Sequence, residues 1–392
     1  MIFVRTFLPF AVILAVACAP PNPEGFEFIE ASGPGTGLPH LTTSADGQVW
    51  MLHTLTASHP RDWEVQLSRL GADGWEAAGA PLTGLRLARF ASGAAAEPRL
   101  RWIAPYEPGR QEHSEVWGWS GSGYVRETSF LPPAASQWFP PTIHGSGVDP
   151  AGRHLVGFGE TPQELRVFAQ DATGAYVSLG DRVVTEEEAG KNNAMGHVEF
   201  VFLPNGEPVA VYLQGSSSGT TFGFKRFNGS EWEAHAPQLV PVDLVDVTGW
   251  DVQLDATGRL LFVYSTNQAG QGENAVHVHR LSAEGDWENL GRLTGEGPSS
   301  GEFPHIRHDA SGRVFVSFVM GEWAEARIHL FRLTGAEWTQ LGATVNAGGS
   351  VWHAGLTLTA DGTPILAWSE SQPSALGFGS SSSVYSARYV GP

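Results

Sequence analysis

The chain has 392 residues, of which 42% are hydrophobic and 16% are charged, a composition typical of a folded globular protein rather than a disordered one. Lysine and arginine total 23 against 41 aspartate and glutamate residues, which gives a formal net charge of −18. Because nucleic acids and anionic membrane surfaces attract basic patches, this balance argues against both as partners. It is compatible with cations or with neutral ligands such as sugars.

The N-terminus predicts export. Arg5 precedes an apolar run from Phe7 to Ala17, which is shorter than the roughly 20 residues of a membrane-spanning helix. The run ends at Cys18, the single cysteine of the chain, so no intrachain disulfide can form. The letters AVAC resemble the lipobox of bacterial lipoproteins, although Ala15 stands where leucine is usual.

That resemblance implies a signal peptide over 1–17, acylation of Cys18, and a lipidated tether over 18–25 whose prolines make it stiff. Residue 19 is alanine rather than the aspartate associated with inner-membrane retention, so an outer-membrane or surface location is expected. The membrane would then be contacted through the lipid anchor only.

A tight turn with an acidic or polar residue, a glycine and a following apolar strand recurs along the chain. HDASGRVFVSFV at 308–319 has the same form as LDATGRLLFVYS at 254–265 and TADGTPILAWSE at 359–370. Successive turn glycines lie 50 to 54 residues apart, except for one gap of 105 residues that a degenerate copy at 94–106 divides. The turn glycines are Gly47, Gly152, Gly206, Gly258, Gly312 and Gly362.

A second marker has the same period. An aromatic residue follows a glycine-containing turn at intervals of 49 to 56 residues. A large side chain at a fixed place in every repeat is typical of a structural position, so we expect these residues to fill the gaps between repeats, with Trp232, Trp287 and Trp338 in the core. The full set is Trp75, Tyr124, Tyr176, Trp232, Trp287 and Trp338.

Each period contains four short strands separated by tight turns and loops. In the repeat over 303–342, RIHLFRL alternates apolar and polar residues, and no apolar stripe with helical spacing occurs. Four-stranded units repeated about every 52 residues predict an all-β fold, a seven-bladed β-propeller. The last repeat lacks its fourth strand, and GFEFIEASG at 25–33 fits that place, so we expect this N-terminal strand to complete the last blade and close a single domain over 26–392.

The first strand of each blade lines the centre of such a ring. Several histidines and carboxylates lie there, seven to nine residues before a turn glycine. A ring of this kind could bind a divalent cation or orient a polar ligand, and the alternative is a solvated polar funnel without a ligand. These candidates are His40, His144, His197, Glu199, Asp251, His305 and His353.

Long loops are expected at the same rim. Variable loops on a rigid scaffold are where binding sites concentrate. Trp63, Trp323 and Phe378 fall in or beside these loops, where their rings would suit a sugar or a partner protein. The loops span 54–64, 105–115, 180–196, 265–275 and 369–383.

Two shorter motifs carry less weight. GSSSG at 215–219 matches the G-x-S-x-G pattern around Ser217, but no helix follows, as a nucleophile elbow requires, so a plain loop is expected. His277 and His279 share one face of a strand and could bind one metal ion, but without a third ligand a packed or solvated face is favoured.

The repeat pattern, with D-A-S-G-R-x-F-V-S-F followed by I-x-L-F-R-L-T-G-A-E-W-T-Q-L-G, resembles a repeat found in propeller proteins of myxobacteria and related bacteria. Its aromatic and LG rhythm is similar to that of seven-bladed bacterial sugar-binding propellers, in which ligands lie between blades. The turns are only near matches to the Asp-box of sialidases, and an Arg-Ile-Pro-like start is missing from the sequence.

The sequence therefore predicts a lipid-anchored binding module of the cell envelope, a monomer whose ligand is a glycan or a partner protein on the long-loop face. No resident cofactor is expected apart from the divalent cation considered above. Two alternatives stay open. One is a glycan hydrolase or lyase with acid–base groups in the funnel, and the other is a scaffold without a small ligand.

Overall fold

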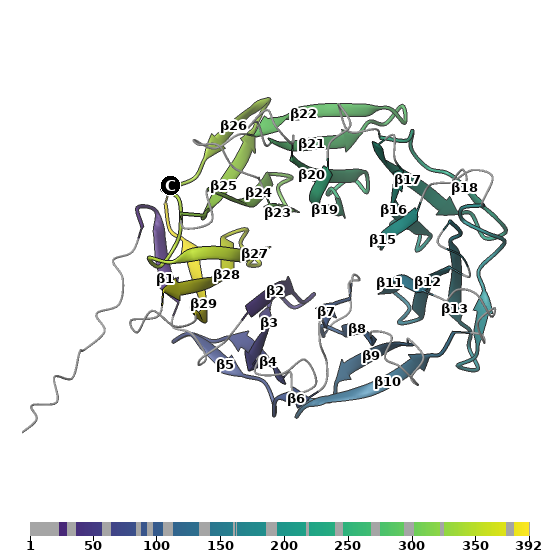
Figure 1. The fold of residues 1–392 in the computed structure, drawn as a ribbon, viewed down its shortest axis with the longest axis horizontal. Helices are drawn as coiled ribbons and strands as arrows, with labels where there is room; N and C mark the ends of the chain where they lie inside the picture. The colour runs from purple at the N-terminus through teal and green to yellow at the C-terminus, as the bar shows by residue number, and fades with distance from the viewer. Residues whose placement is uncertain are drawn as a thin grey trace, which may run out of the picture.

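The computed structural model describes most of the chain from residue 23 onward. All described residues in regular structure are in β-strands, which form seven sheets arranged as a ring (Figure 1). Among them no helix is long and apolar enough to cross a membrane. The described ranges are 23–29, 37–56, 64–83, 88–91, 97–104, 113–132, 142–159, 161, 163–185, 194–216, 219–239, 246–267, 275–293, 302–321, 325–373 and 380–391.

The first three blades lie over residues 37–178. Blade 1 contains β2 (Gly37–Thr43), β3 (Val49–Thr56), β4 (Glu64–Leu70) and β5 (Trp75–Ala77), with β6 (Leu82–Thr83) beside β4. Blade 2 contains β7 (Arg89–Phe90), β8 (Leu100–Ala104), β9 (His113–Trp119) and β10 (Tyr124–Phe130). Blade 3 contains β11 (Thr142–Val148), β12 (His154–Gly159), β13 (Arg166–Gln170) and β14 (Tyr176–Ser178).

The next three blades repeat this order more regularly. Blade 4 contains β15 (Ala194–Phe202), β16 (Pro208–Ser216), β17 (Gly219–Phe227) and β18 (Trp232–Ala234). Blade 5 contains β19 (Asp246–Leu254), β20 (Leu260–Asn267), β21 (Ala275–Leu281) and β22 (Trp287–Leu293). Blade 6 contains β23 (Glu302–His308), β24 (Val314–Met320), β25 (Arg327–Thr334) and β26 (Glu337–Gln340).

Blade 7 closes the ring with strands from both ends of the chain. It contains β27 (Ser350–Leu358), β28 (Pro364–Pro373), β29 (Ser380–Tyr389) and, as its outermost strand, β1 (Phe26–Ile29). Phe26 pairs with Tyr389 in an antiparallel register, and its buried ring meets that tyrosine at a centroid distance of 5.4 Å. The predicted seven-bladed propeller, closed by the N-terminal strand, is confirmed.

The turn glycines have the conformation that the repeat requires. All six have φ between +80° and +87°, a region that side chains disfavour, and each donates its N–H to the carbonyl oxygen three residues earlier. The acid before the glycine holds the turn, because Asp309 Oδ1 accepts from the Ser311 and Arg313 backbone N–H groups at 2.9 Å. Asp149 with Arg153 and Asp255 with Arg259 repeat this arrangement.

The repeat aromatics join neighbouring blades, as expected, but three of them are less buried than expected. The Trp232, Trp287 and Trp338 rings lie half-buried on outer strands rather than in the core. Each indole N–H donates to a carbonyl oxygen of the preceding blade, on Leu179, Pro237 and Leu290, at 2.7–2.9 Å.

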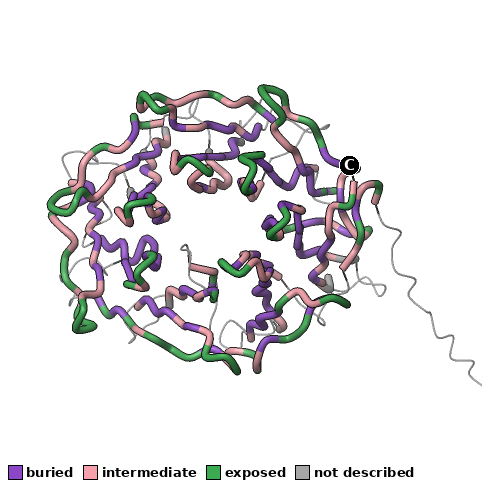
Figure 2. Tube along the Cα trace, turned by 180° about the vertical axis from the view of Figure 1, so that it is seen from behind, coloured by how far each residue is buried: buried purple, intermediate pink, exposed green. Residues whose placement is uncertain are grey.

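The core lies in the second and third strands of the blades. Figure 2 shows the buried residues between the more exposed inner and outer rims of the ring. Every residue of β24 is buried, although its side chains point alternately to opposite faces. Both faces of a blade are therefore covered by its neighbours, which explains the near-continuous apolar runs in the sequence.

Truncating Phe26 tests the closure. Because this ring is 3% exposed and packs in the core of blade 7, the Phe26→Ala variant should lose about 3–5 kcal/mol of unfolding free energy. The matched control is Glu27→Ala, since the neighbouring side chain is exposed and its loss should change stability little. Equal urea midpoints for the two variants would show that β1 does not close the ring.

Candidate binding pocket at the centre of the ring

The inner strands share a local irregularity. In six of the seven blades the described register between the first and second strands shifts by one residue, which is a β-bulge. A bulge re-aims side chains and strengthens the local twist. The bulged strands are β2, β11, β15, β19, β23 and β27, and the shifts occur at or next to His40, His144, His197, Thr248, Pro304 and Trp352.

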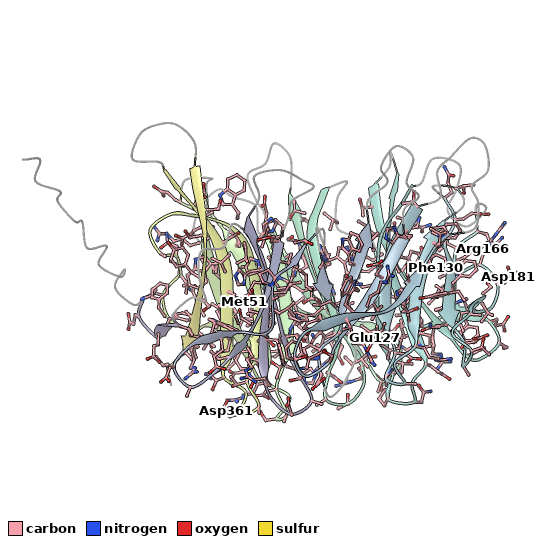
Figure 3. All side chains as sticks on the ribbon, turned by 90° about the horizontal axis from the view of Figure 1, so that it is seen from below. Met51, Glu127, Phe130, Arg166, Asp181 and Asp361 are labelled. Atoms are coloured by element: carbon pink, nitrogen blue, oxygen red, sulfur yellow. The ribbon has the colours of Figure 1, made fainter. Side chains whose placement is uncertain are left out.

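The bulges lie at the end of the ring opposite the tight turns. Inner strands begin where second strands end, as the pairs Gly37–Thr54 and Ser350–Ser371 show. The turn residue Asp361 lies at the other edge of the ring in Figure 3. Four of the predicted long loops start from these second-strand ends, and the fifth, 180–196, leads from blade 3 to the first strand of blade 4. Most of the loop residues, together with Trp63, Trp323 and Phe378, lie outside the described part of the chain.

One pocket collects side chains at or beside five of these six bulges. It has a volume of about 360 Å³ and is lined by residues of every blade except blade 3. Its walls combine imidazoles with apolar and aromatic groups and one guanidinium. The lining residues are Pro39, His40, Arg89, His197, Leu213, Val247, Thr248, Gly249, Trp250, Phe303, Pro304, His305, His353 and Ala354.

Four of the predicted rim residues meet in this pocket, namely His40, His197, His305 and His353. Two further candidates, Glu199 and Asp251, lie behind the wall, where arginines and pocket histidines contact them. His144 is on the inner strand of blade 3, which does not line the pocket.

Glu199 is the centre of a partly buried charge network that joins blades 2, 3 and 4. Its oxygens accept from Arg101 Nη2 at 2.5 and 2.6 Å, and His197 Nε2 donates to Oε1 at 2.6 Å. Arg101 also donates to the Ser146 carbonyl oxygen. Burial alone would raise the pKa of Glu199, but Arg101 and His197 outweigh it and hold the pKa well below the usual range.

Asp251 joins blades 5 and 6 in a similar way. Its Oδ2 accepts from Arg307 Nη1 at 2.6 Å and from the Ile306 backbone N–H at 3.1 Å, and His305 Nδ1 lies 3.4 Å away. Burial opposes ionisation here too, yet Arg307 and His305 lower the pKa of Asp251 to about 2. His305 Nε2 donates onward to the Ala354 carbonyl oxygen of blade 7 at 2.7 Å.

The pocket wall next to His353 is strained. Phe303 has φ +51° and is the only described residue other than glycine with a positive φ. Its ring packs on the His353 imidazole at a centroid distance of 4.2 Å. Gly249 allows the backbone of Phe303 and Pro304 to lie close to β19, because a Cβ on residue 249 would lie 2.9 Å from the Pro304 ring. Backbone strain held by its surroundings is a feature of functional sites.

Two pocket histidines are held neutral. Burial lowers the pKa of His353 to about 4, with the nearby Arg89 and His305 adding to the effect. Burial, Arg89 and the neighbouring histidines also put the pKa of His40 well below its ordinary value. At neutral pH both imidazoles can therefore donate one hydrogen bond and accept another.

Arg89, Arg101, Trp250 and Phe303 were not among the sequence candidates. The Trp250 ring lies beside the His197 imidazole at a centroid distance of 5.8 Å. It also packs against the ring of the buried core residue Phe222. Arg89 lies on the two-residue strand β7 of the degenerate blade, where no turn glycine gives the register.

The described residues contain no group of three or more histidine, cysteine, aspartate or glutamate side chains that could hold a metal ion. His277 and His279 both stack on the Tyr264 ring, at 4.9 and 5.6 Å, as the packed alternative predicted. Ser217 lies outside the described residues.

No protein-family model and no curated protein matches this sequence. Among solved structures, a protein from Lactobacillus plantarum is 12% identical, with 85% of this chain and 94% of that one covered and a TM-score of 0.54. The polysaccharide lyase Uly1 is 11% identical, with coverages of 96% and 94% and a TM-score of 0.50. At these identities the likeness shows the fold alone.

Removing one partner of the Glu199 network tests its role. Arg101→Met would leave a partly buried carboxylate without its main partner, so we expect a loss of about 1–3 kcal/mol in unfolding free energy. Adding Glu199→Gln should recover part of that loss. Arg69→Met is the control, because the Arg69–Glu76 pair is exposed and should contribute about 1 kcal/mol or less. Additive losses in the double variant would contradict the coupling.

Proposed function

We propose that the protein is a carbohydrate-binding module of the bacterial envelope whose ligand occupies the central pocket. The observation that carries the proposal is the convergence of four histidines with Trp250 and Phe303 in one cavity of about 360 Å³. Apolar walls with a few convergent polar groups are typical of small-ligand sites, and the volume is in their usual range. Imidazoles that both donate and accept hydrogen bonds suit sugar hydroxyls.

The comparison with the polysaccharide lyase supports a glycan as the ligand class only by analogy of fold. Carboxylate acid–base hydrolysis is less well supported. It requires a carboxyl group with a raised pKa that reaches the substrate, whereas both Glu199 and Asp251 lie behind the pocket wall with lowered pKa values.

A glycan-cleaving enzyme is the second candidate, since the neutral imidazoles of His40 and His353 face the cavity and could accept a proton. Release of new reducing ends from a bound glycan would favour this candidate over the binding module. A scaffold role without a small ligand would leave the strained pocket wall unexplained.

The location of the protein is part of the proposal. Cys18 and residues 1–17 lie outside the described residues, and the lipobox-like sequence is the support for anchoring. The first strand of the ring, β1, begins at Phe26, so the predicted tether from Cys18 would lead directly into it. The proposal expects a monomer with no nucleic-acid partner, consistent with the net charge of −18.

Glycan-array binding tests the pocket, with the chain produced from residue 19 onward, which omits Cys18 and keeps the closing strand β1 (Phe26–Ile29). His353→Ala should weaken binding of any glycan retained by the wild type about fivefold or more, since the imidazole hydrogen bonds and its packing against Phe303 are lost. The control is His308→Ala, an inner-strand histidine outside the pocket lining. Equal binding by both variants would exclude the pocket as the glycan site.

Fractionation of cells tests the anchor. Cys18→Ser should move the protein from the membrane fraction to the soluble one, because the thiol that carries the lipid is absent. Cys18→Ala is a second variant that also removes the thiol, and it introduces no hydroxyl group in its place. Membrane association that survives both substitutions would refute lipidation as the attachment.

A further inference from the structure

The pocket contains a single fixed charge. Of its described lining residues, only Arg89 is an arginine, lysine, aspartate or glutamate. The Arg89 side chain is about half exposed, with 49% of its surface accessible, although it lies at the centre of a protein with 41 acidic residues. Packing alone does not explain why a positively charged, half-exposed side chain stands at this position.

Glu199, the nearest carboxylate among the described residues, forms no hydrogen bond with this guanidinium. Arg89 Nη1 lies 3.8 Å from Glu199 Oε1, beyond hydrogen-bond distance, whereas Arg101 Nη2 contacts both Glu199 oxygens at 2.5 and 2.6 Å. Glu199 also accepts from His197. Its ionic and hydrogen-bonding capacity is thus largely taken by other groups.

Among the described residues, the charge network around the pocket has a positive excess. Three guanidinium groups, on Arg89, Arg101 and Arg307, face two carboxylates. Even with every histidine neutral, one positive charge remains, and Arg89 is the member of the network that lines the cavity. Guanidinium groups bind carboxylate and sulfate oxygens through two parallel hydrogen bonds.

We propose that the pocket is selective for an anionic saccharide, with the Arg89 fork binding a carboxylate or sulfate group of the sugar. This inference rests on the proposed function, because it names the ligand class of the same pocket. The neutral histidines and Trp250 then contact the hydroxyls and the ring of the sugar.

The net charge of the protein does not oppose such binding strongly. At physiological ionic strength the screening length is about 8 Å, so acidic residues on the outer rim act weakly on a group at the centre. The local positive excess therefore decides the preference. Raised salt should weaken binding of an acidic glycan, and it should leave binding of a neutral one unchanged.

A bound anion would also act on the histidines. Arg89 and His305 face His353, while Arg89, His305, His353 and Arg101 face His40, and all of them disfavour the imidazolium forms. An anion on Arg89 offsets part of that effect and raises both pKa values. Proton uptake then accompanies binding, so affinity for the acidic glycan should rise as the pH falls from 7 to 5.

The test is an array of neutral, uronate-bearing and sulfated glycans, each acidic probe paired with its methyl-ester or desulfated form. The wild type should retain acidic probes roughly tenfold or more above their uncharged pairs, and the uronate and sulfate arms identify the anionic group. Arg89→Gln should abolish the preference, and Arg89→Lys should restore part of it. The exposed Arg69→Gln variant is the control, and melting temperatures check that each variant folds.

Retention of neutral probes at the same strength as acidic ones, with histidine-dependent binding, would overturn the anionic selectivity and keep the carbohydrate pocket. Failure to bind any probe would overturn the proposed function itself. Acidic selectivity that persists in Arg89→Gln would place the anion elsewhere and contradict the assignment of Arg89.

Discussion

Each blade has two apolar faces, and neither can be covered within the blade. Every residue of β24 is buried because blades 5 and 7 cover both sides of blade 6. A linear stack would expose a core face at each end, so the stack must close on itself. The pairing of β1 with β29 accomplishes this by building blade 7 from both ends of the chain. Blade 1 then contacts blade 7 through the Thr43 and Thr357 hydroxyls, 2.8 Å apart.

Closure also determines where polar chemistry can occur. The interior between blades is apolar, while the inner strands converge on the ring axis and retain charged and imidazole side chains. The bulges re-aim these side chains, and ion pairs link the blades behind them: Arg101–Glu199 joins blade 2 to blade 4, and Arg307–Asp251 joins blade 6 to blade 5. These partly buried ion pairs therefore fix the positions of His197 and His305, which line the cavity.

The fold was predictable because its determinants are local and repeated. A glycine at positive φ and an acid that holds the turn recur at almost constant spacing, so the number of blades and the strand exchange follow from counting. The four pocket histidines were found in the same way, from their distance to the turn glycine. Counting failed for Arg89, since blade 2 has no such glycine. It placed Asp251 on the inner strand, but it could not show that Trp250 lines the pocket while Asp251 pairs with Arg307 behind it. The burial of the outer tryptophans was overestimated, because their position at the rim of the ring depends on tertiary packing.

A crystal structure with an acidic oligosaccharide soaked into the ring tests the central claim, that one pocket at the bulges binds an anionic sugar. The account predicts a sugar against Trp250 and His353, with its carboxylate or sulfate within hydrogen-bond distance of the Arg89 guanidinium. A sugar bound between outer strands, with the central pocket holding solvent alone, would contradict it.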